Sequence, residues 1–120
     1  MTENHYIFAE AAEQREYERL RLLEKAFDPA TKKRLVQTGI QPGWQCLEVG
    51  AGAGSISRWL CEQVGDKGLV VAADIVPRFV GDLPANAEVL EADICNAVLG
   101  TERFDLFHFA YMNEHIAGVD

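Results

Sequence analysis

Three glycines at alternate positions constrain this chain more than any other feature. An apolar run with Glu48 near its end is followed by Gly50, Gly52 and Gly54, and then by a helical pattern. Glycine adopts positive φ readily and has no Cβ, so a ligand can approach its backbone closely. The helix that follows would direct its free N–H groups back at residues 50–54, which we call the glycine turn. This pattern favours a nucleotide-like cofactor.

The spacing of the glycines bears on which cofactor the turn would take. The nicotinamide fingerprint is G-x-G-x-x-G, which would place the third glycine at Ser55 instead of Gly54. The observed G-x-G-x-G turn after an acidic residue favours S-adenosylmethionine instead. A tight turn without a ligand remains an alternative when the turn is considered alone.

Short apolar runs alternate with other elements after the N-terminal region. We expect a helix over residues 55–64, at most a short helix over 77–80, and strands over 44–49, 69–73, 88–91 and 104–109. The run 69–73 is apolar throughout, which indicates a strand buried on both faces. Strands that alternate with helices predict an α/β fold with a doubly wound parallel sheet.

The N-terminal region has a helical pattern. Apolar residues recur at spacings of three and four between residues 11 and 27, which predicts an amphipathic helix. Asp28 followed by Pro29 is typical of an N-cap and a first helical position. We therefore expect a second helix from there to about Thr38, with Gly39 as its C-cap.

Composition and charge restrict the class of protein. The 120 residues are 48% apolar and 25% charged, which is typical of one soluble domain. The net charge of −8 disfavours nucleic-acid binding, and no apolar run of about 18 residues predicts a membrane span. The N-terminus has no pattern of a secretory signal. Cys46, Cys61 and Cys95 lack metal-ligand spacing, so we expect reduced packing thiols, no metal and a cytoplasmic location.

Two acidic residues at strand ends are candidate cofactor ligands. Asp74 ends the second strand, and its two carboxylate oxygens match the vicinal diol of a ribose. Adjacent parallel strands end side by side, so Asp74 should lie near the glycine turn. Asp93 follows the third strand and can accept a hydrogen bond from an adenine amino group, with Ile94 packing on the base. A solvated loop position for Asp74 and a helix N-cap role for Asp93 are the alternatives.

Four further candidate residues, all polar or charged, lie in and after the fourth strand. Asp105 is expected to cap or turn the start of the strand, and His108 to be a core or rim histidine with a partner. Glu114 and His115 follow the strand and could act as a general base, but a loop or helix-start role is expected more often. We assign no catalytic residue from the sequence.

Taken together and in this order, these features resemble the class I S-adenosylmethionine-dependent methyltransferases. The acidic residue with the glycine turn, Asp74, Asp93 and the Phe-Asp-Leu strand at 104–106 carry the resemblance. The small-molecule methyltransferases of bacteria are the most similar. They share the Pro-Gly-Trp turn at 42–44 and a helix like Ser-Ile-Ser-Arg-Trp-Leu after the glycines. The likeness covers roughly residues 11–120.

The resemblance implies a fold and a domain organisation. Residues 1–40 would form an N-terminal helical cap, and residues 41–120 a Rossmann-like half-domain that binds S-adenosylmethionine. The strand order would be third, second, first, fourth. The sheet of the family usually continues beyond a fourth strand, where this sequence stops. The resemblance therefore implies the cofactor half of the fold, with a fourth strand open to self-association.

The resemblance also implies contacts with the methionine half of the cofactor. Glu48 and the backbone of Gly50, Ala51 and Gly52 would face this half. The backbone at Phe109 or the next residue would reach the methionine amino group.

Further contacts would hold the adenosine half. Asp74 would bind the ribose and Ile75 would flank the adenine. Asp93 and Ile94 would contact the edge of the adenine. The N-terminal helices would cover the site, with Tyr17 as a contributor.

The implied reaction is methyl transfer to a small-molecule acceptor, with S-adenosylhomocysteine as the product. Positioning supplies much of the catalysis of such a displacement. The alternatives from other classes are a nicotinamide-dependent oxidoreductase domain and a non-catalytic cofactor-binding or dimerisation fragment.

Overall fold

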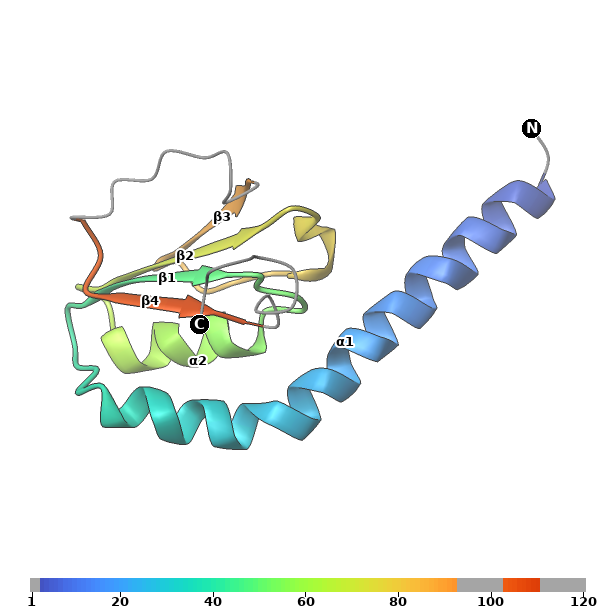
Figure 1. Cartoon of the computed structure of the whole chain (residues 1–120). Coiled ribbons are helices and arrows are strands. Elements are labelled where there is room, and N and C mark those ends of the chain that lie inside the picture. Colours follow the sequence, from blue (N-terminus) through green and yellow to red (C-terminus); the bar gives the residue numbers. More distant parts are fainter. Residues whose placement is uncertain (1–2, 93–102, 111–120) are drawn as a thin grey trace.

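The computed structural model describes residues 3–92 and 103–110. These residues form a four-stranded sheet, the helices α1 and α2 and the short 3-10 helix η1 (Figure 1). In chain order the elements are α1 (Glu3–Gln37), β1 (Gln45–Val49), α2 (Ser55–Val64), β2 (Leu69–Asp74), η1 (Pro77–Phe79), β3 (Ala87–Glu91) and β4 (Leu106–Phe109). Neither α1 nor α2 is both long and apolar enough to cross a membrane, within the described ranges.

The strands form one parallel sheet in the order β3-β2-β1-β4, as the sequence predicts. Strand β1 is central, and its Glu48 lies opposite Ala72 of β2 on one side and His108 of β4 on the other. The carboxyl ends of β1, β2 and β4 therefore meet at one edge of the sheet. The Rossmann-like α/β fold is confirmed.

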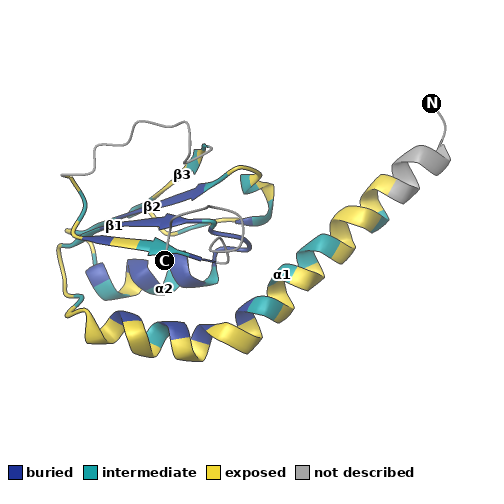
Figure 2. Cartoon of the chain, in the orientation of Figure 1, coloured by how far each residue is buried: buried dark blue, intermediate teal, exposed yellow. Residues whose placement is uncertain are grey.

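Alternate residues of β1 pack on opposite faces of the sheet, as expected for an extended strand. Cys46 packs with Ile56 and Leu60 of α2, whereas Leu47 packs with Val71 on the other face. Strand β2 is buried along nearly its whole length, which confirms the prediction from its apolar sequence. Figure 2 shows that burial concentrates in the sheet, in α2 and in the part of α1 beside them.

The N-terminal region corrects the expectation of two helices. It forms the single helix α1, 35 residues long, with Pro29 inside it. Proline lacks the N–H that would bond the carbonyl of Lys25, and its ring crowds the preceding turn, so a bend is expected. Figure 1 shows that α1 changes direction and that its N-terminal end projects away from the sheet. Asp28 is no N-cap here, because α1 continues through it, and its carboxylate accepts a hydrogen bond from Ser55 Oγ (2.5 Å).

The other predicted elements differ from the structure by at most two residues at their boundaries. Helix α2 has the predicted limits, the short helix after β2 is η1, and β4 begins at Leu106 instead of 104. Gly43 has a φ of 90°, as its turn position requires. Asp93, Ile94, Cys95, Glu114 and His115 lie outside the described residues.

Candidate cofactor site at the carboxyl ends of the strands

The glycine turn connects β1 to α2, and its three glycines all have positive φ: 79° at Gly50, 60° at Gly52 and 86° at Gly54. A Cβ on Gly54 would lie 2.8 Å from the carbonyl oxygen of Val80, so this position tolerates no side chain. A Cβ on Gly52 would lie 3.7 Å from Leu20 Cδ2 of α1. Gly54 is thus needed for packing, whereas Gly52 is buried beneath α1 and has room for no more than a small side chain below Leu20.

Backbone hydrogen bonds hold the glycine turn against the end of β2. The amides of Gly50 and Ala51 both donate to the carbonyl of Ala73, at 2.8 and 3.2 Å. The amide of Gly54 donates to the carbonyl of Ala51 at 2.9 Å. These N–H groups fix the shape of the turn, and its residues 51–54 are buried, whereas Gly50 is half-buried.

Asp74 lies at the end of β2 and contacts the glycine turn, where the sequence places it. Its Oδ2 accepts the N–H of Gly52 at 3.0 Å, and its Oδ1 accepts the N–H of Val76 at 2.9 Å. The carboxylate is half-buried, and each oxygen has a further lone pair for another donor. Such a group can accept hydrogen bonds from two adjacent hydroxyls.

Apolar side chains continue the site beyond Asp74. Ile75 is 56% exposed and Val76 is 41% exposed, although both are large hydrophobic residues. They line a depression of about 440 Å³ together with Pro77, Arg78, Val89 and Glu91. This surface suits a flat apolar group such as a nucleobase.

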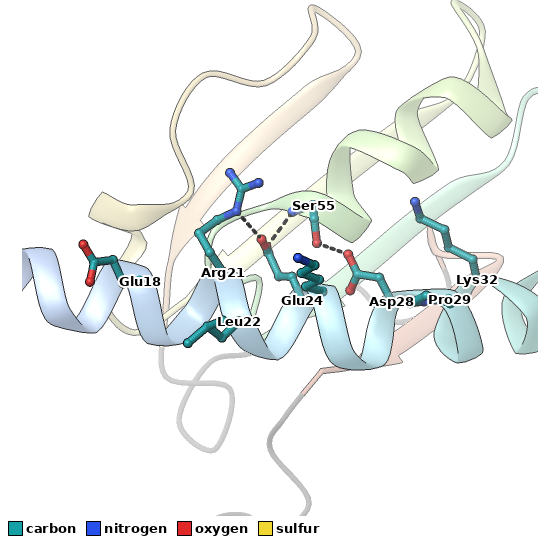
Figure 3. Close-up of a pocket in the computed structure, with 9 residues that line it drawn as sticks. Glu18, Arg21, Leu22, Glu24, Asp28, Pro29, Lys32 and Ser55 are labelled. Atoms are coloured by element: carbon teal, nitrogen blue, oxygen red, sulfur yellow. Dashed lines mark hydrogen bonds and ion pairs between the residues drawn. The ribbon is translucent and has the colours of Figure 1, made fainter.

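The bent helix α1 closes the amino end of α2. Gly54, the N-cap of α2, has no side chain with which to accept a hydrogen bond. Instead Glu24 Oε2 of α1 accepts the N–H of Ser55 at 3.0 Å, and Asp28 accepts its hydroxyl. Arg21 forms an ion pair with Glu24 at 3.2 Å (Figure 3). Carboxylates are favourable at a helix N-terminus, so α1 supplies the cap that α2 lacks.

A depression of about 880 Å³ lies beside these contacts. Its lining residues are Glu18, Arg21, Leu22, Glu24, Lys25, Asp28, Pro29, Lys32 and Ser55 (Figure 3). None of the predicted cofactor residues lines it, so the site at the strand ends is distinct from this depression.

The middle of α1 also contacts η1. Arg78 of η1 forms an ion pair with Glu13 at 3.4 Å, and the Tyr17 and Phe79 rings lie 6.4 Å apart. Together with Leu20 over Gly52, these contacts place α1 over the glycine turn and η1. The sequence predicted such a cover and named Tyr17 for it.

Glu48 lies beneath the glycine turn in a buried hydrogen-bonded cluster. Its side chain is 1% exposed, and its Oε1 accepts the hydroxyl of Ser57 at 2.5 Å. Its Oε2 lies 3.2 Å from Nδ1 of His108. Burial raises the pKa of Glu48, while the hydrogen bonds from His108 and Ser57 lower it. His108 is thus a half-buried histidine with a partner, as the sequence predicted.

Arg58 of α2 fastens the turn to the loop after η1, a role that the sequence did not reveal. Its guanidinium donates to the carbonyls of Ala53 (2.8 Å), Val80 and Asp82 (3.3 Å). The acceptors are main-chain atoms, up to 24 residues away. No residue-type pattern marks such partners in a sequence.

The two cysteines in the described part of the chain are packing residues. Cys46 and Cys61 are buried and free, and burial raises the pKa of Cys46 to about 12 and that of Cys61 to about 11. Their thiols are therefore neutral near pH 7. Among residues 3–92 and 103–110, no group of three or more His, Cys, Asp or Glu side chains is arranged to hold a metal ion.

Phe109, another of the predicted cofactor residues, lies at the end of β4. It lies opposite Val49, and the amide of Ala110 donates to the carbonyl of Val49 at 2.8 Å. The structure thus gathers seven predicted site residues around the same strand ends: Glu48, Gly50, Ala51, Gly52, Asp74, Ile75 and Phe109. The other two, Asp93 and Ile94, are not described.

Comparison with known proteins agrees with this arrangement. A family model described as "Methyltransferase domain" matches residues 47–120. The chain belongs to this methyltransferase family. A crystal structure of a SAM-dependent methyltransferase from Aquifex aeolicus is similar, with 27% identity and a TM-score of 0.58. The similarity covers 78% of this chain and 57% of that one.

A putative methyltransferase from Thermoplasma acidophilum also matches, with 20% identity and a TM-score of 0.45, over 51% of this chain and 30% of that one. The resemblance to class I S-adenosylmethionine-dependent methyltransferases is confirmed by the family match and the Aquifex structure. S-adenosylmethionine is the cofactor that this membership implies. The methyltransferase chain described here spans little more than half the length of the Aquifex protein.

Proposed function

We propose that this chain forms the cofactor-binding half of a methyltransferase that acts on a small-molecule acceptor. The observation that carries the proposal is the hydrogen bond from the Gly52 amide to Asp74 Oδ2. It places a carboxylate suited to a ribose diol directly beside backbone without a Cβ. The residues present therefore fit S-adenosylmethionine.

Each predicted residue has a role in this proposal. Asp74 would accept the ribose hydroxyls through its remaining lone pairs, and Ile75 with its neighbours would receive the adenine. The backbone around Gly52 and at Phe109 would border the methionine half. Glu48 would act from beneath the turn, because its carboxylate is enclosed. Asp93 and Ile94 remain predicted adenine contacts.

When bound, the cofactor supplies an electrophilic methyl group on a sulfonium. The chain's own contribution is to bind and orient, which is the main source of rate in such a displacement. Helix α1, through Leu20 and Tyr17, would shield the turn from water. A proton released by the methylated acceptor would pass to a base or to water, and we assign no side chain as catalytic.

The partners and location that we propose follow the sequence argument. A net charge of −8 opposes nucleic acid as the acceptor, and the small-molecule acceptor follows from the resemblance to the small-molecule methyltransferases of bacteria. We further propose a cytoplasmic location and self-association through β4. The family match does not favour the nicotinamide alternative. Because the chain spans 57% of the Aquifex protein, binding is a more direct test than turnover.

The test replaces Asp74 with alanine. We expect Asp74→Ala to weaken S-adenosylmethionine and S-adenosylhomocysteine binding by about 1.5–3 kcal/mol, the range for hydrogen bonds to a charged group. This corresponds to roughly 10- to 150-fold in the dissociation constant measured by calorimetry. The fold should persist, because water can replace the carboxylate at this half-buried position.

Asp66→Ala is the matched control, because Asp66 is exposed in the turn before β2, at the opposite end of the sheet. It should leave both affinities unchanged. Titration with NAD should give no binding. Equal affinities in the Asp74→Ala and Asp66→Ala chains would contradict the assignment of the ribose site.

A further inference from the structure

Three elements contribute polar groups to one buried cluster beneath the glycine turn. Glu48 is on β1, Ser57 on α2 and His108 on β4, and the parallel pairing sets Glu48 directly opposite His108. The Glu48 carboxylate accepts the Ser57 hydroxyl at 2.5 Å and lies 3.2 Å from His108 Nδ1. Glu48 lies two residues before the glycine turn and is 1% exposed, and none of the three side chains is assigned as a proton acceptor in methyl transfer.

The cluster can change its charge by one unit. With an ionised Glu48 and a neutral His108, the pair carries −1, and one added proton makes it neutral. Within the part of the chain that the structure describes, one further charged group acts on it. On α1, the Asp28 carboxylate opposes ionisation of Glu48, while Ala72 faces it from β2 and Ser57 from α2. Because Glu48 is 1% exposed, water screens this charge little.

We infer that His108 is a positioning residue that keeps Glu48 ionised, so that the site prefers a cationic cofactor to its neutral product. The inference rests on the proposed function. S-adenosylmethionine has a sulfonium charge that S-adenosylhomocysteine lacks. A negative charge beneath the turn therefore favours the former, and a proton entering the pair removes that preference. The cluster would thus help the product leave.

The measurement is the ratio of the two dissociation constants, that of S-adenosylhomocysteine divided by that of S-adenosylmethionine. It is determined by calorimetry on the full chain at a series of pH values from about 5 to 8. In the unaltered chain we expect the ratio to rise with pH, by about three- to tenfold. Fixed charges elsewhere would not produce such a rise.

Three variants separate the hydrogen bond from simple packing. Glu48→Gln should hold the ratio at its low-pH value throughout. His108→Phe removes the donor and should lower the ratio near pH 7, whereas His108→Asn supplies an amide N–H and should keep it high. Asp66→Asn, which removes a charge at the opposite end of the sheet, is the control and should not change the ratio.

The outcomes distinguish this inference from the proposed function. If the unaltered chain binds neither ligand, the proposed function is contradicted and the inference falls with it. If both ligands bind with a ratio that is independent of pH, or that Glu48→Gln leaves unchanged, only the inference is contradicted. Equal losses in His108→Phe and His108→Asn would show a packing role alone. Glu48→Gln keeps the test decisive if His108→Phe fails to fold.

Discussion

At Glu48, folding and the proposed cofactor site favour different charge states of the carboxyl group. Burial disfavours its charged form and is the largest influence that raises its pKa. The proposed cofactor site, in contrast, uses that charge. Hydrogen bonds from Ser57 and His108 offset part of the cost of burial, which explains why a polar cluster occupies a place that apolar side chains could fill.

A stability measurement can detect this cost. Because the folded pKa of Glu48 is raised, the folded chain holds its proton more tightly than the unfolded chain does. The resulting stability is complete below the unfolded pKa of about 4.3 and is lost as the pH rises through the folded pKa. Glu48→Gln stays neutral, so it should match the unaltered chain near pH 4 and be more stable at pH 7.

The difference in the free energy of unfolding should grow by at most about 1.4 kcal/mol per pH unit between these limits. Urea denaturation at a series of pH values measures it. Asp66→Asn, at an exposed carboxylate, should show no such divergence. Curves for Glu48→Gln and the unaltered chain that stay parallel across the series would contradict the expected cost.

At the scale of elements, α1 and α2 depend on each other. Helix α2 begins at a glycine N-cap, and its first amide is bonded by Glu24, which lies 31 residues earlier in the chain. Glu24 is 5% exposed, so this contact is shielded from water. Glu24 and Leu20 both lie before Pro29, so one segment of α1 caps α2 and also lies over Gly52.

Replacing Glu24 tests this dependence. Glu24→Gln keeps the shape of the side chain but removes its charge from the helix N-terminus, so we expect a loss of about 1–2 kcal/mol of stability. Hydrogen exchange of the Ser55 amide should become faster. Glu18→Gln, an exposed carboxylate on the same helix, is the control and should have little effect. If the two variants are equally stable and exchange alike, α1 does not cap α2.

The sequence predicted those elements whose signals are local. The limits of α2 and the position of Asp74 beside the glycine turn follow from hydrophobic patterns and glycine geometry, whereas the strand order was implied by the family resemblance. The Asp28-Pro29 pair misled the prediction because its local meaning is a helix start. In the structure Asp28 is hydrogen-bonded to Ser55, 27 residues away, and Glu48 is hydrogen-bonded to His108, 60 residues away. Patterns of neighbouring residues contain no information on such distant partners.

At the scale of the whole molecule, the described sheet has two edge strands. Strand β4 pairs with β1 on one side, and within residues 3–92 and 103–110 its other side has no partner strand. Phe107 on β4 is 38% exposed and Val89 on the opposite edge strand, β3, is 48% exposed. An edge with unpaired backbone groups and exposed apolar side chains readily pairs with another chain.

We therefore expect the 120-residue chain to self-associate through β4 at micromolar concentrations. Sedimentation velocity over a concentration series measures this. Phe107→Lys places a charge on the edge, as natural edge strands often do, and should shift the distribution towards monomer. It should also lower the stability somewhat, because the Phe107 ring packs on Phe104 with the ring centroids 5.6 Å apart. Val89→Lys makes the same change on β3 and should have no effect. A chain that is monomeric at high micromolar concentration with a cooperative melt would contradict the expectation, and loss of association in Val89→Lys alone would assign it to β3 instead.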